Sequence, residues 1–238
     1  MLSLFRGFER FSVEYLLISG QASVLYGAAT FSEDIDIWVR PSRPNLTRFL
    51  EALASCQARV YKLTPPLELR YLRAGHGFHF VVPSRPVPTY LDVLGQPPRV
   101  ASYARCRLRS RLLETDWGRL PVVGIEDLVA LKKTRRLSDY EIISNLVSVR
   151  LAQASSPSRN LLQWAARNTF RAEDRLEYFK RLGRPVSLRQ CRRDVTGELA
   201  RQQALDVAYW RSRIAELRRL RKAGRLLPEG TSVSRLPR

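Results

Sequence analysis

The stretch DIDIWVR, residues 34–40, begins with a strict alternation of acidic and apolar side chains. Successive side chains of a β-strand point to opposite faces, so Ile35 and Ile37 are expected on one face and Asp34 and Asp36 on the other. This period of two predicts a strand with one buried face. The chain has 22 acidic residues against 41 basic ones, so two carboxylates on one strand face need a physical reason.

The neighbouring patterns predict an α/β (α+β) fold in which helices flank a mixed sheet. Expected strands lie at 14–19, 34–40, within 68–82 and at 89–94, and expected helices lie at 21–29 and, capped by Asn45, within 41–55. A hairpin turning near Gly118 and helices at 124–134 and 138–152 follow.

A basic, all-helical extension is predicted after a linker at 154–159. Its helices are expected at 160–182, 187–195 and 197–223, and the last carries an apolar stripe of Trp210, Ile214 and Leu217 beside a row of cations. These cations are Arg211, Arg218, Lys222 and Arg225. The expected division of the chain is 1–95, 96–153 and 154–225, with a flexible tail at 226–238.

The charge of the chain is strongly positive, at +19 with a sequence pI of about 10.9. Residues 151–238 hold 20 basic and 8 acidic residues, which is +12 of that total. Such an excess favours nucleic acid as a partner, and an anionic membrane surface second. A GC-rich source, which enriches arginine everywhere, explains the same excess without a partner, and a solvated basic face is the matching alternative for the last helix.

Other features limit the location and the chemistry. No apolar run approaches the roughly 20 residues of a membrane span, and the N-terminus is a poor signal peptide. Three separated cysteines fit a reducing cytoplasm and argue against a disulfide scaffold or a cysteine zinc site. His76 and His79 have a metal-like spacing, but no acid or cysteine cluster accompanies them, so packed or surface histidines are the preferred interpretation.

The two aspartates indicate a cation site. Residues two apart on a strand have Cα atoms about 6.6 Å apart, so Asp34 and Asp36 present two anions to one spot. Hard divalent ions such as Mg²⁺ choose carboxylate oxygens and would relieve the repulsion. Asp92, within the alternating TYLDVL, offers a third carboxylate that would complete a site for two ions. Taken alone, the pair has an equally good explanation as an edge-strand device for solubility.

A candidate anion site precedes these acids. Ser19 and Gly20 end one expected strand and open a helix, where a glycine allows close approach of a ligand and free N–H groups face it. The order of these residues along the chain therefore favours a triphosphate that lies between this turn and a cation bound by the aspartates.

These residues resemble the motif region of the nucleotidyltransferase superfamily, which has the polymerase-β-like fold. ISGQASVLYGAATFSEDIDIWV is closest to the minimal and AbiEii-type bacterial members, and VVGIEDLVALKKTRRLSDYEIISNL is similar to their second conserved region. The resemblance covers about residues 10–150, and it makes 1–95 the catalytic core, with 96–153 completing the nucleotide site.

The resemblance implies a role for each matching residue. Asp34, Asp36 and Asp92 would be catalytic and would ligate Mg²⁺, with Asp92 placing or activating the acceptor hydroxyl. Nucleotide contacts would come from Ser19, Gly20, Gln21, Lys132, Lys133 and Asp139. Thr30 and Ser32 stand where many relatives have Arg and Thr, a departure that leaves room for an inactive descendant.

Two functions follow as expectations. The first is an Mg²⁺-dependent enzyme that moves a nucleoside monophosphate from a nucleoside triphosphate to an acceptor hydroxyl. The preferred acceptor is RNA, tRNA in particular, bound through the basic C-terminal helices; a protein side chain or an aminoglycoside-like molecule is the other option. The AbiEii-type resemblance implies a toxin with a cognate antitoxin. The second is a catalytically inactive protein of this fold that binds nucleic acid or a protein partner, as an antitoxin would.

Overall fold

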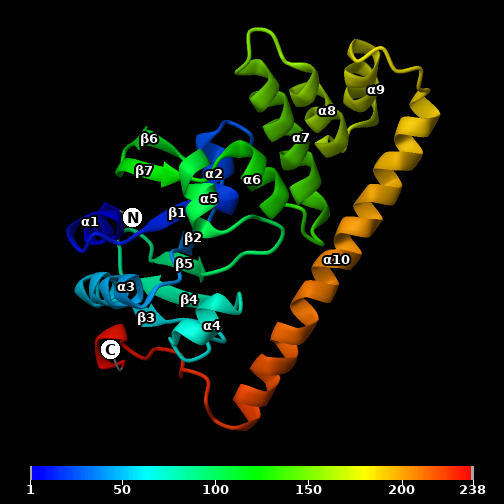
Figure 1. The fold of residues 1–238 in the computed structure, drawn as a ribbon. Coiled ribbons are helices and arrows are strands. Elements are labelled where there is room, and N and C mark those ends of the chain that lie inside the picture. The colour runs from blue at the N-terminus through cyan, green and yellow to red at the C-terminus, as the bar shows by residue number, and fades with distance from the viewer. Residues whose placement is uncertain (1, 237–238) are drawn as a thin grey trace. The chain divides into compact units, whose positions relative to one another are not determined.

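A computed structural model of the chain describes residues 2–236 and divides them into two compact units (Figure 1). The first unit contains residues up to Ala22, residues 31–124, and the C-terminal residues from Arg211 on. The second contains residues 23–30 and 125–210. The expected division at 95 and 153 therefore differs from the structural one, because the end of the chain returns to the first unit.

The first unit is built on a seven-stranded mixed sheet. Its strands are β1 (Tyr15–Ile18), β2 (Ile35–Val39), β3 (Arg59–Val60), β4 (Gly77–Val82), β5 (Thr89–Leu94), β6 (Arg111–Thr115) and β7 (Gly118–Val122). They lie in the order β3-β4-β5-β2-β1-β7-β6. The pairs β2–β5 and β1–β7 are parallel, and the other neighbouring pairs are antiparallel. This confirms the predicted mixed sheet with flanking helices.

One face of the sheet is covered by α1 (Leu2–Arg10) and α3 (Arg43–Ser55). The Phe8 ring lies 5.0 Å from that of Tyr15 and 5.8 Å from that of Phe49, and Phe49 continues to Phe80 at 6.1 Å. Because Tyr15 and Phe80 come from strands on either side of β2, these rings join both halves of the sheet to the two helices. The core therefore lies on the side of Ile35 and Ile37, as their alternation predicts.

Three shorter helices complete the first unit: α2 (Ser19–Leu25), whose last residues pass into the second unit, α4 (Leu69–Arg73) and α5 (Tyr103–Arg109). On the other face of the sheet, Trp38 is fully buried, donates its indole N–H to Gly95 O and packs edge-on against Tyr103. This end of the face is closed by tertiary packing.

The end of the chain packs instead of being loose over residues 226–236. Gly230 N–H donates to Val60 O, and Val60 N–H donates to Thr231 O, so the segment pairs with β3. A short 3₁₀ helix, η1 (Val233–Arg235), packs on α3. The expected flexible tail is therefore ordered up to residue 236.

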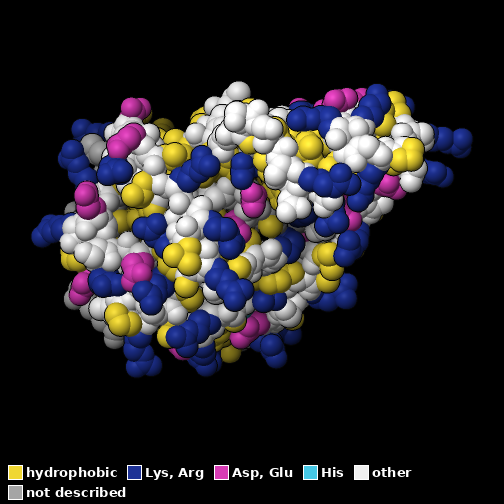
Figure 2. Space-filling model, turned by 45° about the horizontal axis from the view of Figure 1, so that its top comes forward, with side chains coloured by type: hydrophobic (Ala, Val, Ile, Leu, Met, Phe, Trp, Pro, Cys, Tyr) yellow, Lys and Arg dark blue, Asp and Glu magenta, His cyan; other side chains and the backbone are white. Residues whose placement is uncertain are grey.

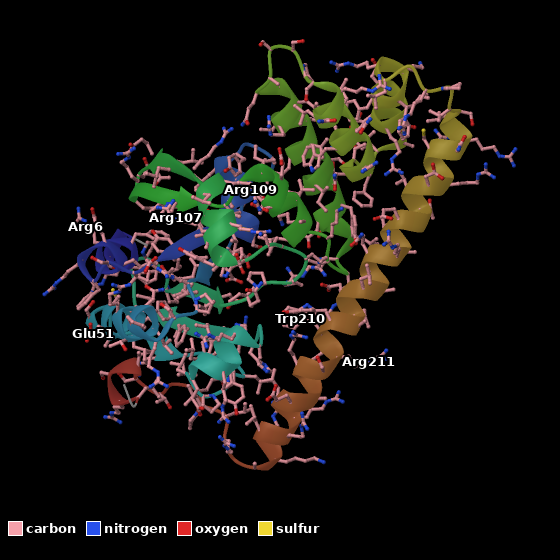
Figure 3. All side chains as sticks on the ribbon, viewed as in Figure 1. Arg6, Glu51, Arg107, Arg109, Trp210 and Arg211 are labelled. Atoms are coloured by element: carbon pink, nitrogen blue, oxygen red, sulfur yellow. The ribbon has the colours of Figure 1, made fainter. Side chains whose placement is uncertain are left out.

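The second unit is helical. Its helices are α6 (Ile125–Leu131), α7 (Leu137–Ala152), α8 (Arg159–Asn168), α9 (Ala172–Arg181) and the first part of α10 (Leu188–Lys222). Figure 3 labels Trp210 and Arg211, where α10 passes from the second unit to the first. The Asn145 side chain donates to Ala28 O, which ties residues 23–30 to α7.

Several predicted elements differ from the observed ones. The helix expected at 160–182 is interrupted, because Phe170 N–H donates to Ser144 Oγ and the Phe170 ring packs 4.6 Å from Tyr140. The helices expected at 187–195 and 197–223 form the single helix α10. A glycine inside a helix costs roughly 1 kcal/mol, and the neighbouring helical turns outweigh that cost at Gly197.

Two details of the predicted helices are also wrong. Ser42, not Asn45, precedes α3; Asn45 is fully buried inside it and bonds Glu14 N–H and Glu14 O. On α10, Ile214 of the expected stripe is exposed, whereas Trp210 and Leu217 are half-buried. Arg213 and Glu216 add polar contacts, with Ala74 O and His76.

Candidate functional site

Asp36, Asp92 and His79 stand in a single row on one face of the sheet, on the neighbouring strands β2, β5 and β4. Asp36 pairs with Asp92, and Asp92 pairs with His79. Ile18 of β1 pairs with Asp36 and continues the row. Each is on the face opposite Ile35, Ile37 and the two covering helices. The row is what positions the candidate site.

Asp36 and Asp92 are the centre of this row. They are direct partners on parallel strands, and neighbouring strands lie about 4.8 Å apart, so both carboxylates leave the same face side by side. Both residues are half-buried, whereas the apolar residues that flank them are buried. The predicted juxtaposition of these two acids is present.

His79 is the partner of Asp92 that the sequence did not assign. Its Nδ1 lies 2.7 Å from Asp92 Oδ1, and its side chain is 26% exposed. Because an ionised carboxylate only accepts hydrogen bonds, Nδ1 is the nitrogen that carries the proton in this pair. The main chain of His79 is fixed as well, since its N–H donates to Thr64 Oγ1. The histidine thus orients one oxygen of Asp92 and leaves Oδ2 for other contacts.

Asp34 stands two residues before Asp36 but precedes the strand, in a bend. Its carbonyl oxygen accepts from Ser32 Oγ at 3.2 Å. Within residues 2–236, no three His, Cys, Asp or Glu side chains form a group that could hold a metal ion. The structure therefore brings Asp36 and Asp92 together and does not add Asp34 to them as a preformed three-ligand site.

The pair still has the donors of a magnesium site that is completed by a substrate. Mg²⁺ is commonly bound by one or two carboxylates together with substrate phosphates, instead of by an all-protein cage. Asp36 and Asp92 supply two carboxylates on rigid strands, half-exposed and on one face. This donor set fits the expected ion.

The turn at Ser19, Gly20 and Gln21 contacts the loop before β2, and its predicted role in nucleotide binding stays a prediction. Ser19 has φ +58°, a left-handed conformation that glycine adopts more readily than serine. A Cβ on Gly20 would overlap the Ser32 hydroxyl. Gln21 Nε2 donates to Ser32 O at 2.9 Å. The Ser32 side chain thus lies against Gly20, in the space that a side chain there would fill. Together with the Gln21 hydrogen bond, this contact fixes the loop that leads to Asp34.

Lys132, Lys133 and Asp139 belong to the second unit. Lys132 Nζ lies 2.8 Å from Asp139 Oδ1, and both side chains are at most 10% exposed. Asp139 also accepts from Thr134 Oγ1 at 2.6 Å. Lys132 and Asp139 therefore form a buried ion pair that closes the loop between α6 and α7. Their contact with a triphosphate stays a prediction. Lys133 is half-buried and lines a cleft in the same unit.

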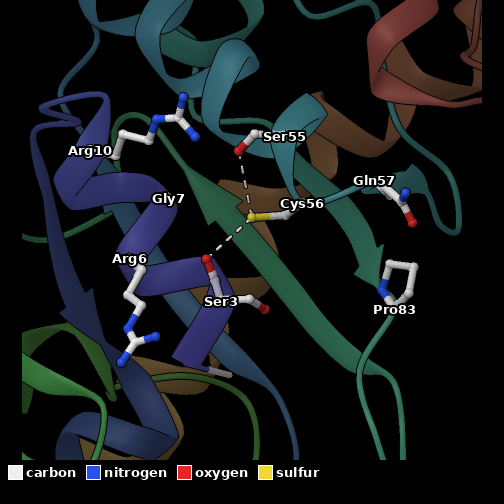
Figure 4. Close-up of a pocket in the computed structure, with 8 residues that line it drawn as sticks. All are labelled: Ser3, Arg6, Gly7, Arg10, Ser55, Cys56, Gln57 and Pro83. Atoms are coloured by element: carbon white, nitrogen blue, oxygen red, sulfur yellow. Dashed lines mark hydrogen bonds between the residues drawn. The ribbon is translucent and has the colours of Figure 1, made fainter.

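A small hollow in the first unit lies apart from these residues (Figure 4). It encloses about 380 Å³ between α1 and the end of α3, and Arg6 and Arg10 stand at its edge. Cys56 Sγ donates to Ser3 O at 3.3 Å on its floor. None of the predicted site residues lines this hollow, so it is not the candidate site.

Basic side chains are more numerous than acidic ones at the surface that Figure 2 shows. No helix of residues 2–236 combines the length and apolar composition needed to cross a membrane. These features agree with the charge and the hydropathy pattern of the sequence.

Comparisons with known proteins assign the chain to no family. No family model and no characterised protein matches the chain in sequence. A solved structure described as the crystal structure of JHP933 from Helicobacter pylori is similar over 90% of this chain and 93% of its own. Its sequence identity is 11% and its TM-score 0.43.

Proposed function

We propose that the protein is an Mg²⁺-dependent nucleotidyltransferase that transfers a nucleoside monophosphate from a nucleoside triphosphate to a hydroxyl of RNA. The observation that carries this proposal is the Asp36–Asp92 pair, two carboxylates held side by side on parallel strands. The resemblance of residues 10–150 to nucleotidyltransferases supports the reaction class, and the charge of +19 supports a polyanionic acceptor.

The chemistry assigned to the chain is proton transfer and positioning. The acceptor hydroxyl attacks the α-phosphorus, a new P–O bond forms, the bond to the β-phosphate oxygen breaks, and pyrophosphate leaves. The hydroxyl proton passes to Oδ2 of Asp92, while His79 holds Oδ1 and fixes the orientation of the carboxylate. Asp36 lies beside it on the neighbouring strand.

The metal would be held by Asp36 and Asp92, with phosphate oxygens as further ligands. When bound, Mg²⁺ supplies neutralisation of the charge on those oxygens. The two carboxylates keep their separation because both strands are fixed by main-chain hydrogen bonds on either side.

Substitution of the pair tests the proposal. With Mg²⁺, each α-labelled nucleoside triphosphate and total RNA, Asp36→Asn and Asp92→Asn should each lower label transfer at least about 100-fold, since each removes a group that contacts the reacting atoms. Asp116→Asn is the matched control, because Asp116 is exposed in the β6–β7 turn and should leave transfer unchanged. Transfer at the wild-type rate by a folded Asp36→Asn/Asp92→Asn variant would refute the proposed enzymatic function of this pair.

A second function, a protein of this fold that binds nucleic acid or a partner without catalysis, is favoured by two contacts and by the position of Asp34. The Ser32 side chain fills the space beside Gly20 where a phosphate was expected, and Lys132 is paired with Asp139. Asp34 does not join the other acids in a three-ligand group within residues 2–236. This function predicts no Mg²⁺-dependent nucleotide affinity in the wild-type protein, which equilibrium binding of each labelled triphosphate with and without Mg²⁺ measures.

A further inference from the structure

A cleft in the second unit is lined by charged and polar side chains alone. It encloses about 710 Å³ among α8, α9, the first part of α10 and the loop after α6. Five of its lining residues are cations and two are acids. The cations are Lys133, Arg167, Arg175, Arg193 and Arg201, and the acids are Asp194 and Glu198. The remaining lining residues are an asparagine and a glycine, so no apolar side chain is present.

Arg175 is built into the wall of this cleft. It is 6% exposed, and its Nε donates to Ala166 O at 2.7 Å while NH2 donates to Arg167 O at 3.3 Å. These bonds use the free carbonyls at the end of α8 and fix the guanidinium in place. Burial lowers the pKa of Arg175, which reflects the cost of holding a cation there. The charges of Asp194 and Glu198 offset part of this cost, since both raise the pKa of Arg175.

Within residues 2–236, neither acid forms an ion pair with Arg167 or Arg193, and the charge of Asp194 acts on the buried Arg175. Glu198 is taken up by Arg201 NH1 at 3.3 Å and by Gln202 Nε2 at 2.7 Å. Over residues 2–236, the side chains of Arg167 and Arg193 make no ion pair and no hydrogen bond. The cleft therefore presents two guanidinium groups whose donors are available.

The lining selects the class of ligand. Guanidinium groups bind phosphate oxygens through two parallel N–H donors. Protein partners are usually anchored by aromatic or aliphatic side chains, and this cleft offers no place for them. The volume exceeds that of one phosphate ion, and the absence of aromatic rings among the lining residues leaves the bases without stacking partners.

We propose that this cleft binds the phosphodiester backbone of RNA, without preference for base sequence. This cleft would be the place where the RNA acceptor is bound, so the inference rests on the proposed function. RNA binding can be measured without nucleotide and without transfer. A cleft that does not bind RNA and a protein that does not transfer nucleotide are therefore distinguishable results.

The test uses the full chain and a labelled single-stranded 20-mer RNA over a range of NaCl concentrations. Arg167→Ala/Arg193→Ala should weaken binding at least about tenfold at 0.15 M salt. It should also reduce the slope of log K against log salt by about 1.4, since each lost phosphate contact on a single strand accounts for about 0.7. Both side chains are exposed, so the fold should be retained, as an unchanged circular-dichroism melt will verify.

The matched control is Arg159→Ala/Arg189→Ala, which removes the same charge from exposed positions of α8 and α10 outside the cleft. An RNA of another sequence should be affected equally. The inference is overturned if both double variants weaken RNA binding to the same extent, or if an acidic polypeptide of equal charge displaces the RNA as well as unlabelled RNA does.

Discussion

At Gly20, the absence of a side chain makes room for Ser32. Because a Cβ there would meet Ser32 Oγ and Cβ, Gly20→Ala should lower the free energy of unfolding by about 1–3 kcal/mol. Ser32→Gly in the same chain should recover most of that loss by removing the obstructing side chain. Urea unfolding followed by tryptophan fluorescence measures both.

Gly197→Ala is the control for this substitution, since nothing lies within 4 Å of a Cβ there and the residue is inside α10. It should stabilise the chain by about 0.5–1 kcal/mol. If Gly20→Ala costs the same with and without Ser32→Gly, the contact with Ser32 is not the cause of the loss.

The acids could be predicted from their own strand, whereas their partner could not. The alternation around Asp36 and Asp92 fixes the face of each, and the parallel pairing of β2 with β5 then places them together. The sequence assigns His79 no site role because no acid or cysteine cluster accompanies it along the chain, and only the register of β4 against β5 places it opposite Asp92. Register follows from the whole sheet, so a short motif around His79 carries no signal of the contact.

Between α6 and α7, the buried pair of Lys132 and Asp139 should determine the stability of the loop. Asp139→Ala leaves the Lys132 ammonium buried without its partner, so it should cost about 3–5 kcal/mol. Lys132→Met/Asp139→Ala should cost less than Asp139→Ala alone, because the unpaired charge is gone. Thermal and urea unfolding measure these differences.

The exposed pair of Arg192 and Glu173 in the same unit is the control, with side chains about 65% exposed. Glu173→Ala should cost at most about 1 kcal/mol. A cost of Asp139→Ala no larger than this, together with loss of nucleotide affinity in Lys132→Met, would instead support the triphosphate role that the sequence implies for Lys132.

Helices and strands with strong local patterns were predicted well, and their interruptions were not. The hairpin at Gly118 and the strands at 34–40 and 89–94 follow from period and turn residues. The break at Phe170 follows from a hydrogen bond to Ser144, 26 residues away. No local propensity encodes that bond, and the continuity of α10 through Gly197 is the opposite case, in which neighbouring turns outweigh a local breaker.

The charge of the protein is distributed differently from the prediction once the two units are known. The second unit carries 16 basic and 10 acidic residues, and the first carries the other 25 and 12. Much of the excess assigned to a C-terminal helical region therefore belongs to the first unit, because residues from Arg211 on return to it. The cleft among α8, α9 and α10 is thus a local concentration of cations in the less basic unit.

A net charge of +19 should make salt act in opposite directions on stability and on RNA binding. Self-repulsion destabilises a compact state of high net charge, and salt screens it, with a Debye length of about 10 Å at 0.1 M and about 3 Å at 1 M. Raising NaCl from 0.05 to 0.5 M should therefore raise Tm by a few degrees while it weakens RNA binding steeply. Differential scanning calorimetry and RNA titration on one preparation measure both. A Tm that falls with salt would show that attractive ion pairs, such as Arg40 with Glu14, outweigh the repulsion.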